Sequence, residues 1–165
     1  MIITQKIFLK RDGDEVTTAD SEQNADAIII CPENKNNAIK KILLSFLNKP
    51  GRIIIDFEDI LAELRNRSIL TAGYGEYSGE NHPITAARDA LSSLIKAGGK
   101  ADKHSDFIIL HFACSKDTTM SALTNAVEFL SKTFSPDAKV VFGQSFDETS
   151  REMTTCVILT SPYCL

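Results

Sequence analysis

The stretch SILTAGYGEYSGENHPITAARDALSSL, residues 68–94, passes from one type of secondary structure to another within a few residues. Its start, residues 68–74, is largely apolar and predicts a buried strand. From residue 82 to 97 apolar side chains recur at helical spacing, and Gly98-Gly99 would end that helix. The stripe expected to face the core consists of Ile84, Ala87, Leu91, Leu94 and Ile95. A strand followed directly by an amphipathic helix is a building unit of layered α/β domains.

The glycines in this stretch, Gly73, Gly75 and Gly79, raise the question of a phosphate-binding loop. Their spacing, GxGxxxG, only approaches the GxGxxG fingerprint of dinucleotide sites. Glu76 and Glu80 lie beside them, and two carboxylates there would repel a pyrophosphate. No Walker-type GxxxxGK[ST] occurs in the sequence. We therefore predict a structural use, in which glycine allows a bend between strand and helix.

The rest of the chain continues the alternation of strands and helices. Short apolar runs predict strands, and apolar stripes at helical spacing predict helices. Further strands are expected at residues 25–31, 52–56, 106–114, 138–143 and 154–160, and further helices at 34–48, 57–66 and 118–133. The last two strands are expected to be antiparallel, and residues 10–24 to form a long solvated loop or an eroded element. This order predicts an α/β (α+β two-layer) domain with a mixed β-sheet covered by helices.

Composition limits the functions to consider. The 165 residues include 18 Lys and Arg against 22 Asp and Glu, which gives a net charge of −4. No basic block is present, so nucleic acid is not an expected partner. No run has the length of a signal-peptide core or a membrane span, so we expect a cytoplasmic protein that does not bind membranes. The cysteines lack zinc-ligand spacing, so we expect no metal and buried free thiols at Cys31, Cys114 and Cys156.

Acidic residues gather in the stretch PGRIIIDFEDI, residues 50–60. Asp56 and Asp59 are three apart, a spacing that places both on one face of a helix, and Glu58 lies between them. One interpretation is that acids in a first helical turn complement the helix dipole and remain solvated. The other is a carboxylate pair that positions a water molecule or a cation. The spacing alone does not choose between the two.

The histidines do not predict a catalytic site. His111 and Cys114 are three apart in an expected strand, so their side chains point to opposite faces and cannot share a metal. His104 lies in a charged loop, where a surface histidine is expected. His82 opens a helix, where a cation is mildly unfavourable, so a neutral or partner-contacting role is favoured. Without a GxSxG elbow no Ser-His-Asp set can be assembled, and we expect no catalytic residue and no cofactor.

Three motifs occur in order along the chain: DFED at 56–59, GYGEYSGE at 73–80 and PDAKVVFG at 136–143. Together they resemble the FtsZ/tubulin family at its synergy loop and C-terminal domain, and ADAIIICPENK at 25–35 is similar to the segment before the family's central helix. The resemblance covers about residues 25–161. It implies N-terminal remnant strands and a central-helix-like segment over residues 1–50, and an FtsZ C-terminal-like domain over residues 51–165, in one compact unit. The GxGxxxG glycines then serve the bend and the close packing of strand on helix.

The resemblance also implies a role for the acidic stretch. In the family the synergy loop enters the nucleotide pocket of the next subunit, and Asp56 and Asp59 fall on its two aspartates. The family's asparagine is Ile54 here, the small residue between the aspartates is Glu58, and an arginine position is His82. The partner interface implied by the resemblance consists of Asp56, Glu58, Asp59 and His82.

The function implied by the resemblance follows from what the printed sequence contains. The family's phosphate-binding signature GGGTGTG is not found in it, so we expect no independent GTPase and no enzyme. The expected function is a non-catalytic interaction module that binds or caps filaments of FtsZ or a related tubulin-like protein. The alternative is a repurposed fold that binds a small ligand or forms a homo-oligomer, unrelated to cell division. A decayed fragment that still folds is a third interpretation.

Overall fold

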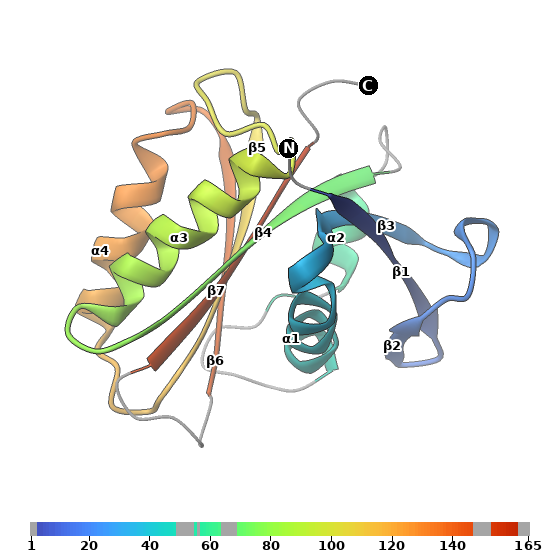
Figure 1. The fold of residues 1–165 in the computed structure, drawn as a ribbon, viewed down its shortest axis with the longest axis horizontal. Coiled ribbons are helices and arrows are strands. Elements are labelled where there is room, and N and C mark those ends of the chain that lie inside the picture. Colours follow the sequence, from blue (N-terminus) through green and yellow to red (C-terminus); the bar gives the residue numbers. More distant parts are fainter. Residues whose placement is uncertain (1–2, 49–54, 56, 64–68, 147–152, 162–165) are drawn as a thin grey trace.

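The computed structural model describes residues 3–48, 55, 57–63, 69–146 and 153–161, and Figure 1 shows their arrangement. The strands are β1 (Thr4–Asp12), β2 (Glu15–Thr18), β3 (Ala27–Pro32), β4 (Ile69–Ser78), β5 (Phe107–Cys114), β6 (Lys139–Phe146) and β7 (Met153–Thr160). The helices are α1 (Asn36–Asn48), α2 (Phe57–Glu63), α3 (His82–Lys96) and α4 (Met120–Ser131), with short 3-10 turns at Glu22–Asn24 and Glu33–Lys35. The strand expected at 52–56 lies almost entirely outside the described residues.

The strands form one mixed seven-stranded sheet in the order β2-β1-β3-β4-β7-β5-β6. The pairs β3–β4 and β5–β6 are parallel, and the other neighbouring pairs are antiparallel. The predicted α/β fold with a mixed sheet is therefore confirmed. The last two strands, β6 and β7, do run in opposite directions, but β5 lies between them, so they are not hydrogen-bonded neighbours.

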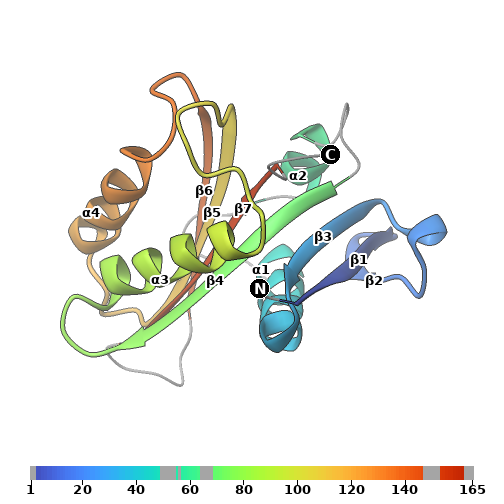
Figure 2. The same cartoon turned by 45° about the horizontal axis from the view of Figure 1, so that its top comes forward.

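Helices cover both faces of the sheet. Helices α3 and α4 lie side by side on one face, and α1 lies on the opposite face (Figure 2). Each face has its own hydrophobic cluster: Leu94 and Leu123 belong to the α3–α4 cluster, and Ile39 and Leu43 of α1 belong to the other. The amphipathic stripes therefore bury where the layered fold requires them.

Helix α3 packs against β4 through small residues. A Cβ atom added at Gly73 would overlap the carbonyl oxygen of Ala90, and one at Gly75 would overlap that of Ala86. The predicted close packing of strand on helix is thus present, and Gly79, with φ of 131°, supplies the bend. The predicted apolar stripe was wrong at its end, because Ile95 is 56% exposed. The close approach of the backbones at Gly75 favours alanines at positions 86 and 90 of the buried face.

Residues 10–24 differ from the prediction of a solvated loop. Most of them belong to a β-hairpin of β1 and β2, in which Asp12 pairs with Glu15 and Gly13 has φ of 65°. Glycine at the first turn position is typical of a two-residue hairpin. Strand β1 also pairs with β3, so the N-terminal residues extend the sheet. The high charge misled the prediction, because these strands lie at a sheet edge and bury few side chains.

The predicted free thiols Cys31, Cys114 and Cys156 are confirmed as buried, and none of the three forms a disulfide bond. In the described part of the chain, no helix combines the length and the apolar character that crossing a bilayer would require.

Candidate partner interface at helix α2

Helix α2 carries the acidic stretch and is fixed by two isoleucines. Ile55, just before the helix, is 1% exposed, and Ile60, within it, is 0% exposed. Residues two positions apart on a helix point in directions about 200° apart around its axis. The side chain at position 58 therefore faces away from Ile60. Glu58 is indeed exposed. The core thus holds α2 in place and directs the Glu58 carboxylate to the surface.

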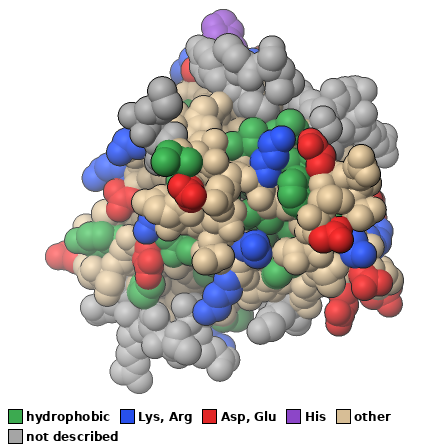
Figure 3. All heavy atoms as spheres, turned by 45° about the vertical axis from the view of Figure 1, so that its right-hand side comes forward, with side chains coloured by type: hydrophobic (Ala, Val, Ile, Leu, Met, Phe, Trp, Pro, Cys, Tyr) green, Lys and Arg blue, Asp and Glu red, His purple; other side chains and the backbone are tan. Residues whose placement is uncertain are grey.

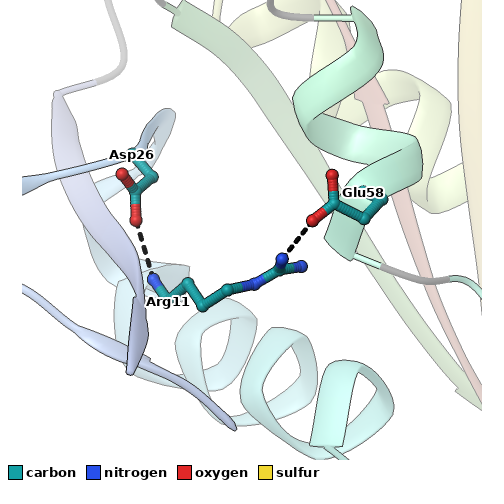
Figure 4. A network of polar contacts seen from close by, with 3 residues as sticks. All are labelled: Arg11, Asp26 and Glu58. Carbon is teal, nitrogen blue, oxygen red and sulfur yellow. Dashed lines mark hydrogen bonds and ion pairs between the residues drawn. The ribbon is translucent and has the colours of Figure 1, made fainter. Parts of the chain in front are cut away.

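An ion pair joins this helix to the N-terminal hairpin. The Arg11 guanidinium, near the end of β1, contacts the Glu58 carboxylate, and the Arg11 backbone N–H donates to Asp26 Oδ2 at 2.8 Å (Figure 4). The side chains of Arg11 and Glu58 are 41% and 57% exposed. Water therefore screens the pair, and it contributes about 0–1 kcal/mol. Its main effect is to place a cation next to the acidic helix.

Sequence reasoning missed Arg11. It lies in the segment that the charge pattern assigned to a solvated loop, and only the hairpin brings it beside α2. The signal that could have found it is the turn sequence RDGDE, residues 11–15, which is typical of a tight hairpin.

Figure 3 shows charges of both signs scattered over the face turned toward the viewer, with several acidic side chains together at one edge.

The two predicted aspartates are described only in part. Asp56 lies outside the described residues. Asp59 belongs to α2, but its side chain is also outside the described part of the structure. Their placement on one helical face therefore remains a prediction from spacing.

His82 does not lie with Glu58. It begins α3, beyond the far end of β4, and the ten residues of that strand span about 30 Å. His82 is half-buried, and its Nδ1 lies 2.6 Å from Thr154 Oγ1 on β7. This hydrogen bond ties the start of α3 to the sheet. The structure thus separates the predicted interface residues, with Glu58 at one end of β4 and His82 at the other.

The described residues give no support for a metal site at this surface. No group of three or more His, Cys, Asp or Glu side chains in the described ranges could hold a metal ion. The surface around α2 instead combines an exposed carboxylate, a neighbouring guanidinium and a helix that Ile60 anchors in the core. Such a surface suits contact with a protein partner.

Comparison with known proteins adds the family relationship. Residues 69–161 match the model of the FtsZ family, C-terminal domain. The mitochondrial division protein fszB of Dictyostelium discoideum is 26% identical over 129 residues, which cover 77% of this chain and 34% of that protein. Cell division protein FtsZ of Helicobacter pylori (strain J99) is 26% identical over 160 residues, which cover 84% of this chain and 41% of that protein. The chain thus spans less than half the length of these relatives.

Solved structures show the same fold. A mutant form of FtsZ from M. jannaschii superposes with a TM-score of 0.66 at 19% identity, over 85% of this chain and 48% of that chain. TubZ in GDP-form protofilaments of Bacillus thuringiensis serovar israelensis gives a TM-score of 0.59 at 13% identity, over 78% of this chain and 34% of that chain. At such identities the likeness concerns the fold.

Proposed function

Because the chain belongs to the FtsZ family, through the C-terminal domain that residues 69–161 match, we propose that it is an interaction module for an FtsZ or tubulin-like partner. The proposed contact surface is the α2 surface, formed by Asp56, Glu58 and Asp59 with Arg11 beside them. One observation carries the proposal: Glu58 is exposed on a helix that Ile55 and Ile60 fix to the core. A carboxylate on a helix that is anchored in this way needs little ordering when a partner binds.

The proposed contact is head-to-tail, because the chain would offer its acidic end to a different surface of the partner. A heterologous contact of this kind extends a filament when both ends of each subunit are competent, and stops it when one is not. The printed sequence carries the DFED motif but no GGGTGTG signature. We therefore propose that the chain binds the end of a filament and caps it, without GTPase activity of its own.

The proposed unit includes the N-terminal residues. The division into residues 1–50 and 51–165 remains a proposal, and contacts across it favour one compact body. Strand β3, from the first part, pairs with β4, from the second, in one sheet. Arg11 adds the ion pair to α2. The hairpin thereby places a cation beside the proposed contact surface.

The test is to mix the purified chain with FtsZ from the same organism and GTP, following light scattering and phosphate release together. A cap should reduce scattering at substoichiometric amounts, because each chain blocks one filament end. Glu58→Lys and the double variant Asp56→Ala/Asp59→Ala should both weaken the effect. Phosphate release tells whether the carboxylates stimulate the partner's GTPase or only occupy its entrance.

The matched control is Glu128→Lys, which makes the same charge change on the exposed surface of α4. This variant should reduce scattering as well as the unchanged chain does. If molar excess of the unchanged chain alters neither scattering nor phosphate release, the proposed function is wrong. If Glu58→Lys and the double aspartate variant reduce scattering as much as the unchanged chain does, the partner binds a surface other than α2.

A further inference from the structure

Strand β6 forms one edge of the sheet. It pairs with β5 on one side, and among the described residues no strand pairs with it on the other. Its eight residues, KVVFGQSF, include no proline and only one charge, Lys139. The opposite edge, β2, is only four residues long. Proteins usually protect long edge strands with charges, prolines or bulges, so β6 has the character of a strand that pairs with another chain.

The hydrogen bonds show which residues of β6 face outward. The Lys139 backbone N–H donates to the Asp106 carbonyl at 2.9 Å, toward β5. In a regular ladder, alternate residues direct their backbone groups to the same side. The outer edge is therefore formed by the backbone N–H and C=O groups of every second residue, namely Val140, Phe142, Gln144 and Phe146.

From this edge we propose that the chain forms a homodimer in which β6 pairs antiparallel with β6 of a second copy. The two-fold axis passes beside Gly143. In this register Phe142 faces the partner's Gln144, and Val140 faces the partner's Phe146. The two seven-stranded sheets then join into one continuous sheet.

Two-fold symmetry leaves only a few possible registers for the β6–β6 pair. A two-fold axis perpendicular to the sheet keeps both α3–α4 layers on the same side, so directly opposite residues must share a face. Registers centred on Phe142 or Gln144 also meet this condition. The first leaves Phe146 without a cross-strand neighbour on β6, and the second leaves Val140 without one. The register centred on Gly143 gives the longest overlap of outward-facing residues.

Side-chain exposure favours the same register. Val140 is 43% exposed and Phe146 is 37% exposed, and they are the large hydrophobic residues of β6 with substantial exposure. With the axis at Gly143, Val140 of each copy lies beside Phe146 of the other copy on the same face of the sheet. Aromatic and β-branched side chains pair well across strands. Lys139 and the partner's Lys139 lie at opposite ends of the ladder, so they do not repel each other closely.

This dimer is independent of the proposed α2 contact. Ile55, just before α2, approaches Gly143 of β6, but it does so on the α1 face of the sheet. The proposed apolar pair of Val140 and Phe146 shares the α3–α4 face with Phe142. Both copies therefore keep their α2 surfaces. Failure of one proposal leaves the other standing.

The test measures molar mass by sedimentation equilibrium over a range of concentrations. The unchanged chain should be a dimer, and Val140→Lys or Phe146→Glu should each raise the dimer dissociation constant by about tenfold or more, because a charge would be placed in an apolar pair. The double variant V140K/F146E places opposite charges across the axis and should restore dimerisation. Restoration depends on the register, which a general loss of stability would not mimic.

The control is Met120→Lys, which adds the same charge at a side chain on α4 that is 42% exposed. It should remain dimeric. Far-ultraviolet circular dichroism of every variant confirms that the fold is kept. A monomer at all concentrations, growth beyond the dimer, or dimerisation unaffected by Val140→Lys would each overturn the proposal.

Discussion

Phe46 of α1 stacks on His111 of β5, with ring centroids 3.9 Å apart and ring planes inclined by 16°. His111 is 2% exposed, and its Nδ1 has no hydrogen-bond partner among the described residues. Burial lowers the pKa of His111 to about 3, because the apolar surroundings disfavour the imidazolium. Helix α1 therefore rests on a neutral imidazole inside the core.

This contact predicts a loss of stability in mild acid. The unfolded chain binds a proton at His111 below its ordinary pKa of about 6.5, whereas the folded chain stays neutral until about pH 3. Because the unfolded state binds more protons in this window, the free energy of unfolding falls as the pH decreases through it. Between pH 7 and 5 we expect His111 to cost about 2 kcal/mol. Urea unfolding at the two pH values measures the change.

Two variants separate His111 from other titrating groups. His111→Phe keeps an aromatic ring against Phe46 but cannot bind a proton, so its stability should change much less between the two pH values. His104→Gln, at an exposed position, should keep the pH dependence of the unchanged chain. Equal pH dependence of His111→Phe and the unchanged chain would contradict the assignment.

The close packing of β4 on α3 predicts a large effect at Gly75. Because a Cβ there would overlap the Ala86 carbonyl, Gly75→Ala must push the helix from the sheet and should cost about 3 kcal/mol. Gly13→Ala is the control: its Cβ would meet nothing within 4 Å, and only its φ of 65° is unfavourable, at about 1 kcal/mol. Urea denaturation of both variants gives the comparison. A loss at Gly75 no larger than that at Gly13 would mean that α3 can move away from β4 at little cost, which would contradict the packing explanation.

How much the sequence could predict depended on whether the signal was local. The alternation of strands and helices was predictable because each stripe, such as that of α4, follows from the period of its own element. The order of strands was not, because the insertion of β5 between β6 and β7 depends on long-range pairing. Ile95 was assigned to the core because periodicity gives the direction of a stripe only roughly, whereas the buried face of α3 runs through Ala86, Ala90 and Leu94.

The candidate site shows the same division. The acidic motif at 56–59 was visible in the sequence, and Glu58 is exposed on a helix as the motif suggested. The sequence could not place Arg11 beside Glu58, because the two residues are 47 positions apart. Their contact depends on where the β1–β2 hairpin lies in the fold. The family resemblance places His82 at the same surface, whereas in the structure the length of β4 separates it from α2.

The ion pair between Arg11 and Glu58 predicts a small effect on stability. Both side chains are well exposed, so water and salt screen their attraction, and a double-mutant cycle of Arg11→Ala and Glu58→Ala should give a coupling below about 1 kcal/mol. The coupling should decrease further in high salt. Urea midpoints of the four proteins provide the measurement. A coupling of several kcal/mol that persists in salt would show that the pair is desolvated and holds α2 in place.

The buried cysteines predict that thiol chemistry reports unfolding of this chain. Burial raises the pKa of Cys31 and of Cys156, so little of the reactive thiolate is present, and both side chains are 0% exposed. Cys164 lies outside the described residues, so the measurement is made on Cys164→Ser.

In that background Cys31, Cys114 and Cys156 should react with a chromogenic disulfide reagent only as fast as the protein opens, and at once in strong denaturant. A Ser92→Cys variant of the same background is the control, because position 92 is exposed on α3 and its thiol should react immediately. Since the three buried thiols lie on different strands, equal rates would indicate opening of the whole sheet. Faster labelling of Cys31 alone would show that the β1–β3 edge opens separately. Immediate labelling of all three in the native protein would contradict their burial.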